Sequence, residues 1–177
     1  MPRSLSAGHT KVAVFPTRPS GDLEALALSV FTSTGVIDAA CRIAMADFEL
    51  GVDDDDTFTD QALCEDVAAE TPGNTKFKGQ WSPYRYFDAE GKAETGTGDD
   101  EIGDALYQLV KVKGTGLWVA RRDTSKMSKE AWGEGDEYKL YRLITGSPGE
   151  SPQEGYIKHP QKLFVQERYD GIVAAAA

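Results

Sequence analysis

The sequence predicts an α+β fold that is mainly β, a mixed sheet or small barrel with one α-helix packed on it and long loops. Four or five segments rich in β-branched and aromatic residues indicate strands. One segment has the apolar periodicity of an amphipathic helix. The segments between them are rich in Gly, Pro and charged residues, which indicates loops. A length of 177 residues suits one domain, so we expect a single domain over residues 1–177.

The N-terminal part is expected to be irregular before the fold begins. Residues 1–22 hold three prolines and little periodicity, which predicts an arm with a short strand at Lys11–Phe15. Residues 23–34 suit a short helix, with Asp22 as its N-cap and Gly35 as its stop. Val36–Ile43 has the composition of a strand.

Two long loops are expected in the middle of the chain. Residues 46–74 contain four consecutive aspartates, several threonines and a Pro-Gly-Asn turn, and a loop of this length in a compact domain is often functional or disordered. Residues 88–100 are rich in Gly and charge and lack core residues. Between these loops, Thr75–Phe87 is rich in aromatic residues and predicts a strand that is interrupted near Pro83.

The clearest helix is predicted over residues 101–113. Acidic residues 99–101 stand where a helix dipole favours negative charge. Basic residues occupy the expected last turn, and Gly114 follows as a C-terminal cap. The apolar face consists of Ile102, Leu106, Leu109 and Val110.

The C-terminal part predicts three strands. Leu117–Arg121 and Asp136–Thr145 are separated by a loop over Asp123–Gly135. Gly155–Arg168 is a longer strand with a break at Pro160. A long exposed strand edge promotes aggregation unless it pairs, so we expect a strand of a neighbouring subunit to pair with this last strand.

The net charge of -10 is distributed unevenly along the chain. Residues 47–104 contain 17 acidic and 4 basic residues, a net of -13, whereas the rest contains 12 acidic and 15 basic residues, a net of +3. Such an acidic chain is a poor binder of nucleic acid, because neutralising phosphates requires clustered Lys and Arg. It could let nucleic acid pass without holding it, because like charges repel. Acidity alone more often serves solubility, and that interpretation stays open.

The sequence has no membrane-spanning run and no apolar stretch near its N-terminus, so we expect no membrane partner and synthesis in the cytoplasm. Cys41 and Cys64 are too few for a disulfide framework. We expect two free thiols, and a bridge between them stays open as an alternative.

Motifs that would carry chemistry are incomplete. Gly114-Thr115-Gly116 follows a helix instead of preceding one, which is the wrong order for a dinucleotide loop. The run Asp53–Asp56 fails as a calcium loop because Phe58 and Thr59 occupy positions that need a ligand and a glycine. A solvated acidic loop is the better interpretation of this run.

The remaining candidate side chains also lack the sequence neighbours that a catalytic or metal site requires. His9 and His159 have no zinc spacing, and nothing around Cys41 resembles a nucleophile turn. We therefore predict no catalytic, cofactor-binding or metal-binding residue, no cofactor, and a protein that is not an enzyme. We expect four aromatic residues to serve core and subunit packing: Trp81, Tyr84, Tyr86 and Phe87.

Four segments in order carry a family resemblance. They are KFKGQWSPYRYFD (76–88), DALYQLVKVKGTGLWVARR (104–122), AWGEGDEYKLYRLITGSP (131–148) and PQEGYIKHPQKLFVQER (152–168). This order resembles the major tail proteins, or tail tube proteins, of actinobacterial long-tailed phages (siphoviruses). The sequence departs from the family pattern at residues 1–31 and in the aspartate run.

The resemblance implies a β-sandwich or barrel with a flanking helix, in which strands of neighbouring subunits join into one barrel. It implies a structural virion protein that self-assembles into hexameric rings, stacked into the tail tube through which the genome is delivered. The implied partners are further copies of the chain and the tape measure, tail terminator and tail tip proteins, and DNA would pass without specific binding. The acidic segment would then line the channel or dock on the basic remainder of the next ring.

Two alternative functions remain open at this point. A tail terminator or head–tail connector subunit would form a single closed ring that never stacks. A small-ligand enzyme or binding domain would need a concave site with convergent polar groups.

Overall fold

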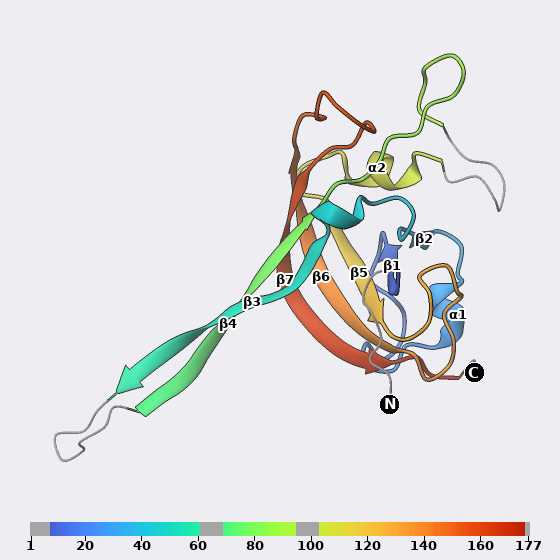
Figure 1. Ribbon diagram of the computed structural model, residues 1–177. Helices are drawn as coiled ribbons and strands as arrows, with labels where there is room; N and C mark the ends of the chain where they lie inside the picture. The colour runs from blue at the N-terminus through green and yellow to red at the C-terminus, as the bar shows by residue number, and fades with distance from the viewer. Residues whose placement is uncertain (1–7, 61–68, 95–102, 176–177) are drawn as a thin grey trace.

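The computed structural model describes residues 8–60, 69–94 and 103–175. Seven strands form one antiparallel sheet in the order β2-β1-β5-β6-β7-β4-β3. The sheet curves strongly, and two of its strands leave the body as a long hairpin (Figure 1). The strands are β1 (Thr10–Phe15), β2 (Ile37–Asp38), β3 (Glu49–Asp60), β4 (Ala69–Trp81), β5 (Gly116–Asp123), β6 (Glu137–Pro148) and β7 (Gln161–Ile172). The prediction of a mainly β, α+β fold is confirmed.

The sheet is covered on both faces, which explains why β1 and β5 are apolar without alternation. One core packs beneath helix α2 (Ala105–Val110) and includes Trp81 and Leu143. The other packs beneath helix α1 (Leu28–Phe31) and the loop before β6, and includes Trp132 and Leu140. A strand that is buried on both faces is apolar along its whole length, so apolar and polar residues do not alternate in it.

The body of the sheet is tied together by one buried amide. Trp81 Nε1 donates a hydrogen bond to Gln161 Oε1 at 2.8 Å. Gln161 Nε2 donates to the carbonyl oxygens of Val110 at 2.8 Å and Gly146 at 2.9 Å. This side chain therefore connects the base of β4, the end of α2 and the turn region of β6.

A buried guanidinium fixes the loop between β5 and β6. Arg122 is fully buried and donates to Asp136 and to the carbonyl oxygens of Met127, Glu130 and Ala131. Burial alone would raise the pKa of Asp136, but hydrogen bonds from Lys126, Gly133 and Arg122 hold this pKa below its ordinary value. The predicted loop over Asp123–Gly135 is confirmed, and its conformation depends on this ion pair.

The prediction of a long loop over residues 46–74 is wrong. A short 3₁₀ turn (Met45–Asp47) leads into β3, and β3 pairs with β4 from Glu49↔Gln80 to Asp60↔Ala69. Both faces of the hairpin are polar, so an inward apolar face was missing from the sequence pattern. Cross-strand pairing between residues 31 positions apart at Glu49↔Gln80 and 9 positions apart at Asp60↔Ala69 forms the strands instead. Residues 61–68, which include Cys64, lie outside the described residues.

Both predicted helices are shorter in the structure. Helix α1 begins after Ala27, and Asp22 instead accepts a hydrogen bond from the backbone N–H of Glu24 in a turn. Helix α2 begins after Asp104 and ends at Val110. Asp104 does not cap it, because its buried carboxylate accepts from Arg85 Nε at 3.0 Å and from the Tyr86 N–H at 3.1 Å. Tertiary contacts thus replace the local capping signals.

Several predicted boundaries also move. The strand expected within the N-terminal arm is confirmed as β1, which lies between β2 and β5. The strand predicted over Val36–Ile43 is reduced to β2. Gly114 has a φ of +87°, as a left-handed position requires, but it lies in the turn before β5, three residues after the helix C-cap at Lys111. The last strand begins at Gln161, directly after Pro160, and not at Gly155.

Candidate assembly surfaces

The groups considered for catalysis or metal binding do not converge. His9 Nδ1 lies 3.1 Å from the carbonyl oxygen of Lys126, and His159 Nδ1 lies 2.8 Å from that of Gly149. Cys41 is exposed. Within residues 8–60, 69–94 and 103–175, no group of three or more His, Cys, Asp and Glu side chains could hold a metal ion.

The aspartate run lies on β3 and is partly neutralised across the hairpin. Asp53 forms an ion pair with Lys78 at 2.8 Å, and Asp56 pairs with Lys76. The hydrogen bond that Lys76 donates to the Asp56 carboxylate raises the pKa of Lys76. Asp54 and Asp55 have no ion-pair partner among the described residues. The run is thus a solvated strand segment and not the loop that was expected.

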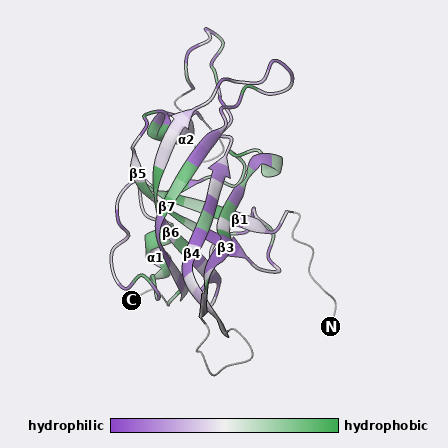
Figure 2. Ribbon diagram, turned by 90° about the vertical axis from the view of Figure 1, so that its left-hand side faces the viewer, coloured by the Kyte–Doolittle hydropathy of each residue, from purple (hydrophilic) through white to green (hydrophobic). Residues whose placement is uncertain are grey.

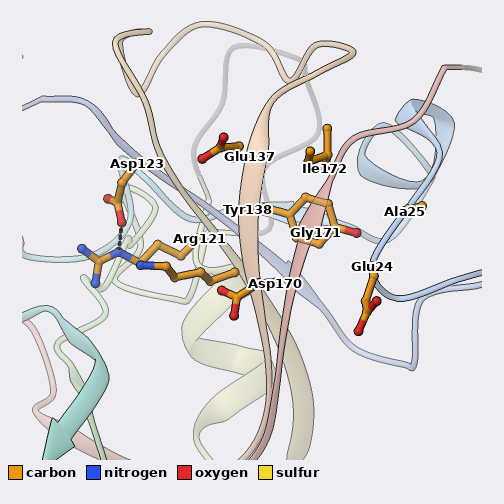
Figure 3. Close-up of a pocket in the computed structure, with 10 residues that line it drawn as sticks. Glu24, Ala25, Arg121, Asp123, Glu137, Tyr138, Asp170, Gly171 and Ile172 are labelled. Carbon is orange, nitrogen blue, oxygen red and sulfur yellow. Dashed lines mark ion pairs between the residues drawn. The ribbon is translucent and has the colours of Figure 1, made fainter.

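An open groove of about 660 Å³ lies where β5 and β7 end and β6 begins (Figure 3). Arg121 and Asp123 form an ion pair at 2.6 Å on one side of it, and Asp170 and Gly171 of β7 lie on the other. Its lining contains no Ser, Cys or His side chain. The groove is a wide surface depression beside the edge of β7, which suits docking of a chain segment better than enclosure of a small molecule.

Strand β7 has a long open edge. Strand β4 pairs with it only at Gln80↔Lys162 and Trp81↔Gln161. Next to these pairs, Gly79 permits a close approach of the two strands, since a Cβ there would lie 2.8 Å from the Leu163 carbonyl oxygen. Farther along, the two strands diverge. No other strand of the described chain pairs with this side of β7 between Leu163 and Gly171.

The direction of the backbone N–H groups on this edge follows from one hydrogen bond. Ile172 donates its N–H to the carbonyl oxygen of Glu24, on the side away from β6. Alternate residues of a strand direct their N–H groups to the same side. The N–H groups of Asp170 and Arg168 therefore point to the open edge, where no strand of the described chain supplies an acceptor.

Strand β3 is one of the two terminal strands of the sheet, the other being β2, and it is protected against pairing. Its register with β4 shifts between Val52 and Asp54 and again between Asp55 and Thr57. Charged side chains and bulges are the devices by which proteins prevent edge strands from associating. The two edges differ in kind, because the aspartate run protects β3 whereas β7 has no comparable series of like charges.

The sheet face beside the open edge is also partly uncovered. Ile144 on β6 and Phe164 on β7 are directly paired across the strands, and Phe164 is 53% exposed. Both side chains point away from α2, because their neighbours Leu143 and Leu163 belong to the core beneath that helix. This exposed aromatic–aliphatic pair beside the open edge is a candidate contact surface.

The four aromatic residues divide between core and surface. Trp81 is buried in the core, as predicted. Tyr84 and Tyr86 are half-buried, and Phe87 is exposed beneath the Arg85 guanidinium, which lies 4.6 Å from its ring centroid.

The sequence identified the last strand as a candidate edge but not the protected edge of β3. The run Asp53–Asp56, flanked by the β-branched residues Val52 and Thr57, was the pattern that could have indicated a charged edge strand.

Comparison with known proteins identifies the chain. The family model described as phage tail tube protein matches residues 1–177. No curated protein and no solved structure matches the chain. Within the described residues, no helix is long and apolar enough to cross a membrane. The family is structural and is not an enzyme family. The chain therefore belongs to the phage tail tube protein family and is a structural component of the virion tail.

Proposed function

We propose that this protein assembles into rings of six subunits that stack into a hollow tube, the conduit for the phage genome. Copies of the chain are its main partners. Its other partners are the tape measure, tail terminator and tail tip proteins. DNA passes without specific binding, because an acidic protein repels phosphates. The protein is made in the host cytoplasm and has no catalytic activity or cofactor.

The open edge of β7 is the observation that carries this proposal. Pairing a neighbour's strand with Leu163–Gly171 extends the antiparallel sheet from one subunit to the next. Repeating the same pairing around a ring joins the sheets into a barrel, which removes the free edge of β7. The exposed Ile144–Phe164 pair lies on the same strands and would be covered by the same contact.

A proline substitution tests edge pairing without disturbing the body. Asp170→Pro removes an N–H that points to the open edge, so it blocks a new strand and leaves the β6–β7 hydrogen bonds in place. Asp170→Ala is the matched control, since it also loses the Arg168–Asp170 ion pair but keeps the N–H. Both variants are examined by circular dichroism as dilute protein and by negative-stain electron microscopy as concentrated protein.

We expect tubes from the wild type and from Asp170→Ala, and folded but unassembled Asp170→Pro. Tubes of normal length from Asp170→Pro would contradict strand pairing at this edge. Wild-type protein that never enters a tube wall, even when a tagged copy is supplied during phage production, would contradict the tube itself. Single closed rings that never stack would identify a terminator or connector instead.

A further inference from the structure

The hairpin β3–β4 changes its register in the middle and then recovers it. Residues 49–52 of β3 pair with β4 in one register, and residues 57–60 pair with it in the same register. In between, Asp54 and Asp55 are one position out of step. We call residues 53–56 together with residues 73–76 the slipped segment. Figure 1 shows the hairpin leaving the body of the sheet, and Figure 2 shows hydrophilic bands along its strands.

Two compensating β-bulges produce this displacement. At the first bulge, Asp53 is an extra residue on β3 with no partner on β4. At the second bulge, Gly73 and Asn74 of β4 lie opposite Asp56 alone. One bulge adds a residue to β3 and the other adds a residue to β4, so their effects on the register cancel. A single bulge would instead displace the pairing of the whole outer hairpin.

A regular register is available to the same residues. Without the bulges, Asp54 would lie opposite Thr75 and Asp55 opposite Asn74, whereas the structure places Asp54 opposite Lys76 and Asp55 opposite Thr75. No pair at the root or at the outer end of the hairpin would change between the two forms. The hairpin therefore has two pairing arrangements that differ only in the slipped segment.

Charge selects the bulged form. Lys78 pairs with Asp53 at 2.8 Å, and Lys76 pairs with Asp56, so each lysine binds the aspartate at one bulge. In the regular register, Asp53 would lie directly opposite Lys76 and diagonally from Lys78, so the two lysines would compete for it. Asp56 would lie opposite Gly73 and would lose its lysine. The bulged form thus supplies each lysine with a carboxylate of its own.

Local contacts also fit the two bulges. The Asp54 carboxylate accepts a hydrogen bond from the Asp55 backbone N–H at 2.9 Å, which gives this N–H an acceptor within its own strand. At the second bulge, a Cβ on Gly73 would lie 2.5 Å from the Phe58 ring and 3.0 Å from the Asp56 carbonyl oxygen. Only glycine therefore fits this position in the bulged form.

We propose that the slipped segment is a two-state joint, and that the ion pairs of Lys76 and Lys78 hold it in the bulged form. A bulge bends its strand and increases the local twist, so a change of form redirects the outer hairpin, which carries Phe58, relative to the body. Loss of the two ion pairs shifts the population towards the regular, straighter form. The joint belongs to the single subunit and does not depend on the tube.

Engineered disulfides distinguish the two registers. Both probes carry Thr75→Cys in a chain with Cys41→Ser and Cys64→Ser, and the second new cysteine replaces either Asp55 or Asp54. Position 55 lies opposite position 75 in the bulged form, whereas position 54 lies opposite it only in the regular form. A disulfide spans directly opposite residues, and successive residues point to opposite faces. Each probe loses one aspartate and keeps both ion pairs.

The oxidation rates of the two probes report the populations. In glutathione buffer, we expect the Asp55→Cys probe to form its disulfide about tenfold faster than the Asp54→Cys probe, followed by alkylation and mass spectrometry. Adding Asp53→Asn/Asp56→Asn removes both exposed ion pairs, and the ratio of the rates should fall about fivefold. The matched control is Glu49→Gln/Glu90→Gln, which removes two exposed carboxylates outside the slipped segment. It should leave the ratio unchanged.

Backbone nuclear Overhauser effects check the register without cysteines. In the wild type, Thr75 should contact Asp55, and in Asp53→Asn/Asp56→Asn the contact should move to Asp54, which unfolding of the hairpin would not produce. Equal oxidation rates of the two probes would overturn the bulged register. A ratio or a contact that does not change in Asp53→Asn/Asp56→Asn would overturn control by the ion pairs. All measurements use dilute, unassembled protein, so they are independent of whether the protein forms tubes.

Discussion

The body of this protein and its β3–β4 hairpin belong to one hydrogen-bonded sheet, yet they are stabilised in different ways. The body places a core on each face of β1, β5 and β6. The hairpin beyond its base has neither core and exposes polar side chains on both faces. Within the described residues, burial therefore stabilises the body, whereas the outer part of the hairpin depends on its cross-strand hydrogen bonds and exposed ion pairs.

Amide hydrogen exchange on the unassembled protein should separate the two regions by the largest margin. Amides of the body, such as those of Val119 and Leu140, open only with global unfolding, whereas those of Asp55 and Thr75 open locally. We expect at least about a thousandfold difference in protection, since each tenfold step corresponds to roughly 1.4 kcal/mol. Assembly should raise protection in the hairpin selectively. Equal protection in both regions before assembly would contradict the comparison.

Removing the buried guanidinium should cause the next largest effect, and only in the body. Arg122→Met leaves Asp136 and three carbonyl oxygens without this donor, and we expect the free energy of unfolding to fall by about 3–5 kcal/mol. Urea denaturation of the monomer measures it. Arg142→Met is the control, because its partner Glu167 lies at the exposed surface and the midpoint should hardly move. Comparable losses in both variants would show that burial does not decide the effect.

The acid stability of the body should depend on Asp136. Its pKa in the folded protein lies below the ordinary value of 3.8, so the carboxylate contributes stability that is present above that pH and is lost as pH falls through the folded pKa. Denaturation midpoints measured from pH 6 downward should show this loss. In Asp136→Asn the stability is lower at pH 6, and the part of the acid dependence due to this group disappears. An unchanged pH profile in that variant would assign the dependence elsewhere.

The smallest effect is expected in the hairpin itself. Lys76→Ala removes an ion pair whose two side chains are largely exposed, so solvent screens it. We expect no measurable change in the thermal midpoint of the monomer. Differential scanning calorimetry checks this. A clear decrease would mean that the hairpin is coupled to the body more strongly than its lack of core contacts indicates.

The sequence predicted the body better than the hairpin, for a physical reason. Strands β5 and β6 and the apolar face of α2 have patterns set by burial, and burial leaves a local signature. The aspartate run forms a strand because β4, a separate segment of the chain, pairs with it along its length, and no local pattern contains that information. The start of the first helix was misplaced because Asp22 accepts a hydrogen bond from the Glu24 N–H in a turn and does not cap the helix. The open edge was partly foreseen, because the length and composition of the last strand are local properties.

The three hydrogen bonds of Gln161 have a mechanical consequence. This one side chain joins Trp81, at the root of the hairpin, to the end of α2 and to Gly146 on β6. Because one side chain holds all three, the root of the hairpin, the end of α2 and β6 keep a fixed arrangement relative to one another. A displacement of the hairpin root is therefore expected to shift the end of α2 and the Gly146 segment with it.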